Sequence, residues 1–189
     1  MVNKEDIINS LRMAGVSRGE VILVHSSLSS FGYVEGGAIT VIEALCEVVG
    51  DDGTVCMPSM FRRDGDRRFE TWNVATSPSD VGKITDVFWR LEGTYRSDHP
   101  THAVAARGKL AQYITQGHRT GKQRIGAWGS YAYGYNSPWQ KLYDLNARVI
   151  LLGTDMKTSS LVHYIEYLIV EYALDKVEQS QRKNLSEMV

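Results

Sequence analysis

The chain has few cysteines, no long apolar run and almost no net charge, and each of these features excludes a class of protein. Only two cysteines, Cys46 and Cys56, occur among the 189 residues, too few for a secreted domain stapled by disulfides. We interpret them as two buried thiols in a reducing compartment. A disulfide or a metal-binding pair is the alternative, although no ligand-like spacing accompanies them.

Apolar runs are too short for a membrane span, which needs ~20 residues. The first residues, Met-Val-Asn-Lys-Glu-Asp, lack the apolar stretch of a signal peptide. The formal net charge of −1 creates no strong field toward nucleic acid or an anionic membrane. We therefore expect a cytoplasmic protein that binds neither nucleic acid nor a membrane.

Apolar strands alternate with amphipathic helices along the chain. Near-continuous β-branched runs at 20–25, 54–58 and 148–153 are typical of strands buried on both faces. Shorter strands are expected at 94–97 and 103–106. Helices are expected over 3–15, 36–49, 79–91 and 109–117, and from Ser137 and Thr158 onward. The alternation predicts an α/β fold with a mainly parallel sheet and helices on its faces, as one domain over 1–175 with a polar tail over 176–189.

A first candidate site is the strand-loop-helix segment HSSLSSFGYVEGGA at 25–38. Hydroxyls, glycines and a helix start gather where a strand ends, which is where ligands bind in open α/β sheets. Such a loop can cradle a phosphate. A polar turn with helix caps is the alternative, because the segment has no P-loop lysine and no dinucleotide-binding glycine pattern.

A second candidate, RSDHPTHAVAARG at 96–108, places a cation, two hydroxyls and two histidines within seven residues. Arg96 is expected to bind a phosphate. His99 and His102 could together ligate a metal. No carboxylate or cysteine at metal-like spacing completes such a set, so no metal site is predicted, and either histidine could instead pack and hydrogen-bond near the core.

A third candidate is SSLVHYIE, with Ser160, His163 and Glu166 three residues apart. On a helix this spacing puts the three side chains on one face. A carboxylate beside an imidazole orients it and favours its protonated form, as a general base requires. A solvated ion pair is the alternative, but the helix follows a buried strand, so its first turn should lie at the ligand edge of the sheet.

Six blocks of the chain, running in order from about Ile7 to Glu166, resemble the aminoglycoside 3-N-acetyltransferases, also called the antibiotic N-acetyltransferase family. Several blocks in order are more specific than any one alone. They are GVSRGEVILVHSSLSSFGYVEGGAITVIEAL, VVGDDGTVCMPSM, SPSDVGKITDVFWR, YRSDHPTHAVAARGK, NSPWQKLYDLNARVILLG and SSLVHYIE.

The resemblance implies a three-layer α/β/α fold with a central, mainly parallel or mixed sheet. It implies acetyl-CoA as donor and a primary amine of an aminoglycoside or amino sugar as acceptor. His163 and Glu166 match the family's catalytic pair, and Ser160 replaces the family's threonine while keeping its hydroxyl. The implied coenzyme-binding residues are Ser26, Ser27, Leu28, Ser29, Arg96, Ser97 and His99.

The end of the chain departs from the family, whose members continue beyond the His-x-x-Glu helix with strands that complete the acceptor pocket. We expect a shortened member. It could instead be a non-catalytic coenzyme-A-binding relative that has lost its acceptor pocket, or rely on a partner chain for the missing surface. The partly apolar stretch 161–174 could also pack against a second copy in a homodimer.

Other readings of the sequence remain open. A serine hydrolase using Ser26 or Ser27 lacks the Gly-x-Ser-x-Gly elbow, and a metal enzyme would use His99, His102 and His163. The loop 61–73 mixes arginines with carboxylates. It is either a solvated charge run or a site for a phosphate-bearing amino sugar, so antibiotic resistance is an expectation from the family alone.

Overall fold

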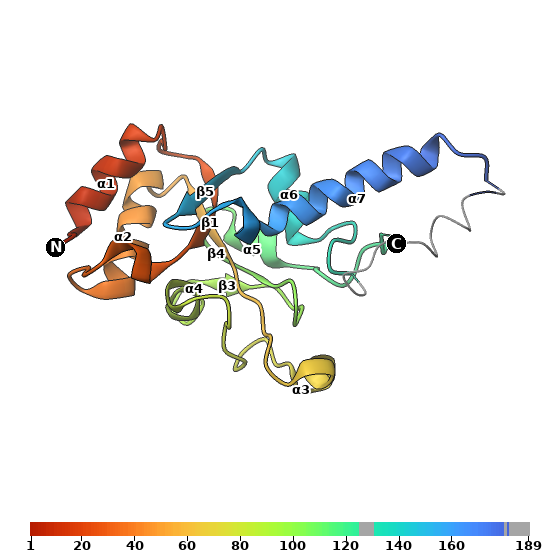
Figure 1. Ribbon diagram of the computed structural model, residues 1–189, viewed down its shortest axis with the longest axis horizontal. Helices are drawn as coiled ribbons and strands as arrows, with labels where there is room; N and C mark the ends of the chain where they lie inside the picture. The colour runs from red at the N-terminus through yellow and green to blue at the C-terminus, as the bar shows by residue number, and fades with distance from the viewer. Residues whose placement is uncertain (125–130, 180, 182–189) are drawn as a thin grey trace.

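One five-stranded mixed sheet forms the centre of the molecule (Figure 1). The computed structural model describes residues 1–124, 131–179 and 181. The strands are β1 (Val21–Ser26), β2 (Thr54–Pro58), β3 (Tyr95–Arg96), β4 (Val104–Gly108) and β5 (Arg148–Leu152). They lie in the order β3-β4-β2-β1-β5. β1 pairs in parallel with β2 and β5, whereas β4 runs antiparallel to β2 and β3.

Helices cover both faces of this sheet, so the molecule has three layers (Figure 1). One face carries α1 (Lys4–Met13), α2 (Gly37–Val49) and α4 (Lys83–Phe88), and the other carries α5 (Ala111–Thr115), α6 (Pro138–Asp144) and α7 (Ser160–Asp175). The short helices are η1 (Leu28–Phe31), η2 (Gly65–Arg67), α3 (Arg68–Thr71) and η3 (Met156–Thr158). The predicted three-layer α/β/α fold is confirmed, and its sheet is mixed.

Side chains along β1 alternate between the two faces, as the pleat of a strand requires. Ile22 and Val24 belong to the core on the α1 and α2 side, whereas Leu23 belongs to the core on the α5 and α6 side. All three are fully buried, which explains the continuous apolar run in the sequence. His25 shares the parity of Leu23, so its ring lies on the same face as α7.

Two of the expected helices, at 3–15 and from Ser137 onward, begin with a side-chain cap. The Asn3 side chain accepts from the Asp6 backbone N–H at 3.0 Å, and the Asp6 carboxylate accepts from the Asn3 N–H at 3.0 Å. The Ser137 hydroxyl accepts from the Gln140 N–H at 3.3 Å, with Pro138 in the first turn. Each cap satisfies a backbone donor that the helix itself leaves unpaired.

The predicted start of the helix over 79–91, with Ser79 as its cap, is wrong, because α4 begins at Lys83 behind Gly82. The Ser79 N–H donates to Asp86 Oδ1 at 2.9 Å, and its hydroxyl lies 3.2 Å from Thr85 Oγ1. Residues 79–82 therefore fold back along α4 instead of starting it. Gly82, at φ +137°, makes the turn possible.

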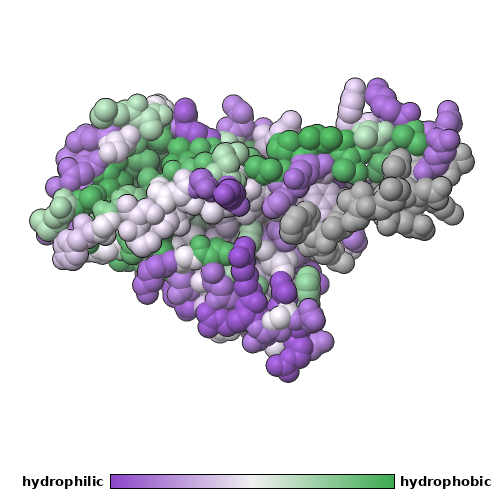
Figure 2. Space-filling view, in the orientation of Figure 1, coloured by the Kyte–Doolittle hydropathy of each residue, from purple (hydrophilic) through white to green (hydrophobic). Residues whose placement is uncertain are grey.

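α7, with 16 residues, is the longest helix of the described chain. It starts beside the sheet and continues past it (Figure 1). Figure 2 shows hydrophobic atoms along its visible side. No helix in residues 1–124 or 131–179 is long and apolar enough to cross a bilayer.

Candidate active site

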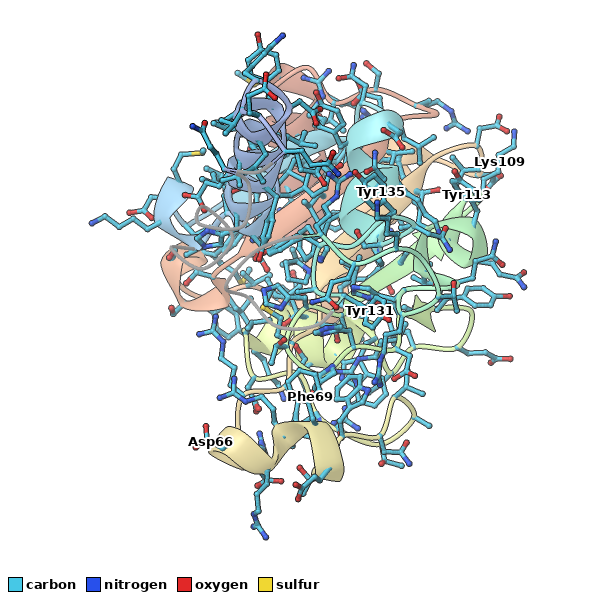
Figure 3. The ribbon with its side chains drawn as sticks, turned by 90° about the vertical axis from the view of Figure 1, so that its right-hand side faces the viewer. Asp66, Phe69, Lys109, Tyr113, Tyr131 and Tyr135 are labelled. Atoms are coloured by element: carbon cyan, nitrogen blue, oxygen red, sulfur yellow. The ribbon has the colours of Figure 1, made fainter. Side chains whose placement is uncertain are left out.

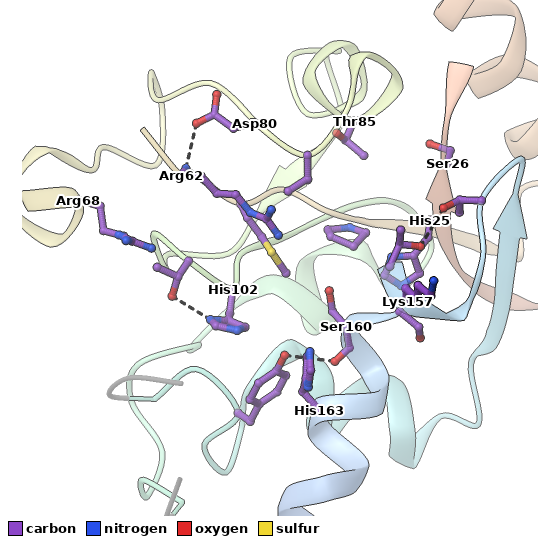
Figure 4. Close-up of a pocket in the computed structure, with 18 residues that line it drawn as sticks. His25, Ser26, Arg62, Arg68, Asp80, Thr85, His102, Lys157, Ser160 and His163 are labelled. Carbon is purple, nitrogen blue, oxygen red and sulfur yellow. Dashed lines mark hydrogen bonds between the residues drawn. The ribbon is translucent and has the colours of Figure 1, made fainter. Parts of the chain in front are cut away.

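A cleft of about 590 Å³ opens beyond the carboxyl ends of β1, β2 and β5 (Figure 4). Parallel strands leave their loops at this edge, so groups from distant parts of the sequence meet there. The lining residues come from the ends of β1 and β2, the loop after β2, the start of α4, the turn before β4, the loop before α6, the segment that joins β5 to α7, and the first turn of α7. The third candidate segment from the sequence opens directly onto this cleft.

His163 and Glu166 form a hydrogen-bonded pair on the first turns of α7. His163 Nδ1 lies 2.8 Å from Glu166 Oε2, and since a carboxylate can only accept, the imidazole donates. The His163 side chain is 37% exposed and that of Glu166 is 56% exposed, so the imidazole borders the cleft while the carboxylate stands on its solvent side. The predicted spacing does bring the two groups together.

Ser160 lies one helical turn before His163, and both residues line the cleft. The backbone oxygen of Ser160 accepts from the Tyr133 hydroxyl at 3.1 Å. Tyr133 also contacts His102, with ring centroids 4.7 Å apart, and both line the cleft. The Tyr133 and His102 rings therefore pack together beside the first turn of α7, and the Tyr133 hydroxyl holds that turn in place.

His25 and Ser26 bring unpartnered polar atoms to the end of β1. His25 is 5% exposed, and its Nε2 finds no hydrogen-bond partner among the described residues, nor does the buried Ser26 Oγ. Burial lowers the pKa of His25 to about 4, so the ring is neutral at neutral pH. Leaving such groups unpaired is costly, which marks the end of β1 as a surface shaped for a ligand.

The rest of the predicted coenzyme loop is held by its own hydrogen bonds. The Ser27 N–H donates to Leu152 O at 3.0 Å, and Ser27 Oγ lies 3.2 Å from Ser29 Oγ. Leu28 packs against the core on the α1 and α2 side. Of the four predicted residues, Ser26 is the one that lines the cleft.

Arg96 is half-buried against other protein groups and does not line the cleft. Its guanidinium lies 4.4 Å from the ring centroid of Trp72 and 4.3 Å from that of Trp89. It donates to the backbone oxygens of Ser59, at 2.8 Å, and of Ser77. Burial lowers the pKa of Arg96 to about 10. The geometry favours a clamp on the loop after β2, and direct coenzyme contact stays a prediction.

Ser97 and His99 also face the protein interior. Ser97 Oγ accepts from the Val104 N–H at 2.9 Å and lies 2.9 Å from His118 Nδ1. His99 is fully buried, with its ring stacked on that of His118 at a centroid distance of 4.9 Å. Neither residue lines the cleft, so contact with a coenzyme stays a prediction for both.

Charged residues outside the predicted catalytic and coenzyme sets line two opposite sides of the cleft, and two of them belong to the loop 61–73, for which the sequence offered a phosphate-bearing amino sugar as one alternative. Arg62 and Arg68 come from the loop after β2, and Lys157 comes from the segment before α7 (Figure 4). His25, His102 and Tyr133 were likewise not assigned to the coenzyme or catalytic sets. The sequence feature that could have indicated His25 is its position at the end of β1, directly before the serine-rich loop that starts at Ser26.

Metal-binding geometry was the remaining alternative for the histidines. Within the described residues, no group of three or more His, Cys, Asp or Glu side chains is arranged to hold a metal ion. His102 Nδ1 instead lies 2.8 Å from Thr101 Oγ1. Burial, followed by the nearby His99 and His163, lowers the pKa of His102 to about 3.

Comparison with known proteins gives one family. The model of the family described as aminoglycoside 3-N-acetyltransferase matches residues 23–187. A prophage-derived aminoglycoside N(3')-acetyltransferase-like protein of Bacillus subtilis, YokD, is 33% identical over 88% of this chain and 65% of its own length. Aminoglycoside N(3)-acetyltransferase IV of a Salmonella species is 35% identical over 87% of this chain and 59% of its own length.

Solved structures agree with the sequence comparison. The crystal structure of YokD from Bacillus subtilis matches with a TM-score of 0.76 at 32% identity, over 88% of this chain and 71% of that one. The aminoglycoside acetyltransferase AAC(3)-IVa apoenzyme matches with a TM-score of 0.75 at 34% identity, over 90% and 62%. The chain spans about 60 to 65% of the length of the curated relatives it matches. The chain belongs to the aminoglycoside 3-N-acetyltransferase family.

Proposed function

We propose that this cleft is the acetyl-transfer site of an acetyl-CoA-dependent N-acetyltransferase whose acceptor is a primary amine of an aminoglycoside or amino sugar. The observation that carries the proposal is the 2.8 Å contact between His163 and Glu166 at the edge of the cleft. A relative solved with coenzyme A, AAC-IIIb, supports the donor. A variant of AAC(3)-IVa solved with apramycin supports the acceptor class.

The residues of the cleft fit an acyl-coenzyme A. Ser26 Oγ and His25 Nε2 are buried polar atoms without protein partners among the described residues, suited to the amide and carbonyl groups of a pantetheine arm. Lys157 on the same side of the cleft supplies a positive charge suited to its phosphates (Figure 4). Acetyl-CoA, when bound, supplies a thioester that is already activated for acyl transfer.

His163 acts as the general base in this proposal. Donation from Nδ1 to Glu166 directs the chemistry to Nε2, which takes a proton from the amine as its nitrogen bonds to the acyl carbon. The carbon–sulfur bond breaks in the same exchange, and the sulfur leaves as the coenzyme thiol once it gains a proton. The products are an acetamide and free coenzyme A, and no acyl-enzyme is required.

Ser160 and the start of α7 stabilise the charge that develops on the acyl oxygen. α7 has no acidic residue in its first turn and no side-chain cap on its first N–H groups. The Val162 N–H donates to Ser159 O at 3.2 Å, so the N–H groups of Ser160 and Leu161, with the positive end of the helix dipole, are the donors suited to an oxyanion beside Ser160. The Tyr133 hydroxyl holds the Ser160 carbonyl, so the first turn keeps its direction while the charge forms.

Calorimetric titration of acetyl-CoA, followed by a thiol-release assay with kanamycin, gentamicin and free amino sugars, tests the proposal. Binding together with amine-dependent thiol release is the expected result. Binding without release from any of these amines would favour a coenzyme-binding protein that does not transfer acetyl groups. Absence of binding would refute the proposed donor.

A further inference from the structure

The charges that line the cleft are mostly positive. Arg62, Arg68 and Lys157 are the cations among the lining residues, and Asp80 is the carboxylate. Figure 4 shows Arg62 and Arg68 on one side of the cleft, Lys157 on the opposite side, and His163 between the two sides. A ligand whose amine approaches His163 therefore meets arginines on the side away from Lys157.

Asp80 does not offset this charge, because its carboxylate is already engaged. Oδ2 accepts from the backbone N–H groups of Arg62 at 2.9 Å and Arg63 at 3.1 Å, and Oδ1 accepts from Arg63 Nε at 2.9 Å. Burial would raise the pKa of Asp80, but these hydrogen bonds outweigh it and hold the pKa below its usual value. The Asp80 carboxylate is therefore ionised at neutral pH, and its two oxygens are occupied by hydrogen bonds from Arg62 and Arg63.

The two arginines of the cleft have no such partner. Within the described residues, neither the Arg62 nor the Arg68 guanidinium forms an ion pair; Arg68 Nε donates to the backbone oxygen of Gly65 at 2.5 Å. The other carboxylates of the segment are exposed, and Figure 3 shows Asp66 at the outer end of the projecting α3 region. Phe69 turns the other way and contacts His99 at a centroid distance of 5.8 Å.

On the side of the cleft lined by Arg62 and Arg68, the described residues offer a polycationic acceptor no carboxylate that is free of other bonds. They offer an anion two guanidinium groups. The Lys157 side adjoins Ser26 and His25 (Figure 4), which the proposed function gives to the coenzyme. The arginine side is left for the acceptor. The loop that carries it is tied down by the Arg96 clamp at Ser59 and Ser77.

We propose that Arg62 and Arg68 form an acceptor subsite for a phosphate-type anion, so that the acceptor class is an amino sugar bearing phosphate. This inference rests on the proposed function for the position of the coenzyme. The amine lies at His163, and the anionic group lies between the two guanidinium groups. Unphosphorylated aminoglycosides are poor acceptors for the site as these residues build it.

A matched pair of sugars tests the subsite: glucosamine and glucosamine 6-phosphate, titrated calorimetrically with coenzyme A present and compared in the thiol-release assay. We expect the phosphorylated sugar to bind at least about tenfold more tightly, and the difference to shrink as salt screens the contact. Arg62→Gln and Arg68→Gln should each remove most of it. Arg67→Gln is the control, because Arg67 is exposed on the same loop but does not line the cleft.

Titration of acetyl-CoA into the same variants separates the two sources of phosphate. Unchanged acetyl-CoA affinity in Arg62→Gln and Arg68→Gln, with Lys157→Gln weakening it, supports the acceptor subsite. Loss of acetyl-CoA affinity in the arginine variants would assign them to the coenzyme and overturn the inference, as would equal binding of the two sugars. Sugar binding without any thiol release would leave the subsite intact while refuting the proposed transferase.

Discussion

Ser97 Oγ lies 2.9 Å from His118 Nδ1, although the residues stand 21 positions apart. On its other side, His118 Nε2 lies 3.1 Å from the backbone oxygen of Ala132. A carbonyl can only accept, so Nε2 carries the proton and Nδ1 accepts from the Ser97 hydroxyl. This arrangement satisfies a neutral imidazole, and burial lowers the pKa of His118 well below its ordinary value.

The free energy of unfolding should therefore fall as the pH drops below about 6.5, the ordinary histidine pKa. Burial lowers the pKa of His25 to about 4 and of His102 to about 3. As the pH falls, these histidines bind protons in the unfolded chain before they do so in the folded chain. The stability that is present above about pH 6.5 is therefore lost as the pH falls from about 6.5 toward the folded pKa values. Each histidine contributes up to about 1.4 kcal/mol per pH unit.

Urea unfolding at several pH values between 7.5 and 5 measures this slope. His118→Gln removes one of the three proton-uptake sites, so its stability should change less steeply with pH even if it is less stable at pH 7.5. Carboxylates interfere little, because their contribution is lost below about pH 5, at the lower end of this range. A variant with an undiminished slope would contradict the role given to His118.

The Arg96 clamp should be sensitive to a change that keeps the charge. Arg96→Lys cannot fill the space between Trp72 and Trp89 or donate to Ser59 and Ser77 together. We expect a loss of about 2–4 kcal/mol in the free energy of unfolding. Cleavage by trypsin in the loop after β2 should also become faster.

Arg90→Lys is the matched control for the clamp. The Arg90 guanidinium also lies 4.3 Å from the Trp89 ring centroid, but it is exposed and pairs with Asp86 across one helical turn. An exposed pair of this kind contributes roughly 0–1 kcal/mol, so the variant should remain close to the parent. Equal losses in the two variants would show that stacking on Trp89, and not the clamp, is what matters.

The fold could be predicted wherever the information is local. The β1 run, the Asn3 cap and the Ser137–Pro138 start depend on neighbours within a few residues, and all three are found in the structure. α4 was misplaced because Ser79 resembles a cap on its own. Its hydroxyl is taken by Thr85 and its N–H by Asp86, and a pattern of residue types does not reveal that competition.

The candidate site likewise contains one contact that local sequence spacing predicts and one that depends on tertiary packing. His163 and Glu166 stand three residues apart on one helix, so their contact followed from helical spacing. Arg96 reaches Ser59 across 37 positions, and its two tryptophan neighbours come from different segments. The sequence showed a cation beside a strand, but only the packing of the loop after β2 reveals that protein oxygens satisfy it.

His163→Ala should lower kcat by about 10²–10⁴-fold with acetyl-CoA binding unchanged, since general base catalysis contributes about that much. Glu166→Gln should cost less, because the amide oxygen can still accept from Nδ1 while its charge is lost. Thiol release with the best acceptor measures kcat, and calorimetry checks that acetyl-CoA binding is unchanged. Glu178→Gln, an exposed position beyond α7, should behave as the parent. Undiminished turnover in His163→Ala would rule out its role as the base.

Tyr133→Phe tests whether the first turn of α7 must be held in place. The change removes one hydroxyl, whose bond to Ser160 O is 3.1 Å long, and leaves the aromatic contacts with His102 and Tyr167 intact. The comparison variant is Tyr164→Phe, which removes a 2.7 Å bond to Gln140 Oε1 and the bond that Tyr164 accepts from Arg124 Nη2 at 3.3 Å, both outside the cleft.

Tyr133→Phe should lose about 1 kcal/mol of stability, the usual net contribution of one hydrogen bond, and Tyr164→Phe about 2 kcal/mol, because its hydroxyl makes two. Only Tyr133→Phe should also lower kcat, by about five- to tenfold, with the KM for acetyl-CoA nearly unchanged, because the donors at the start of α7 act on the charge formed during transfer. If the two variants lose kcat equally, the effect comes from general loosening of α7. If Tyr133→Phe raises KM instead of lowering kcat, Ser160 acts in coenzyme binding and not on the developing oxyanion.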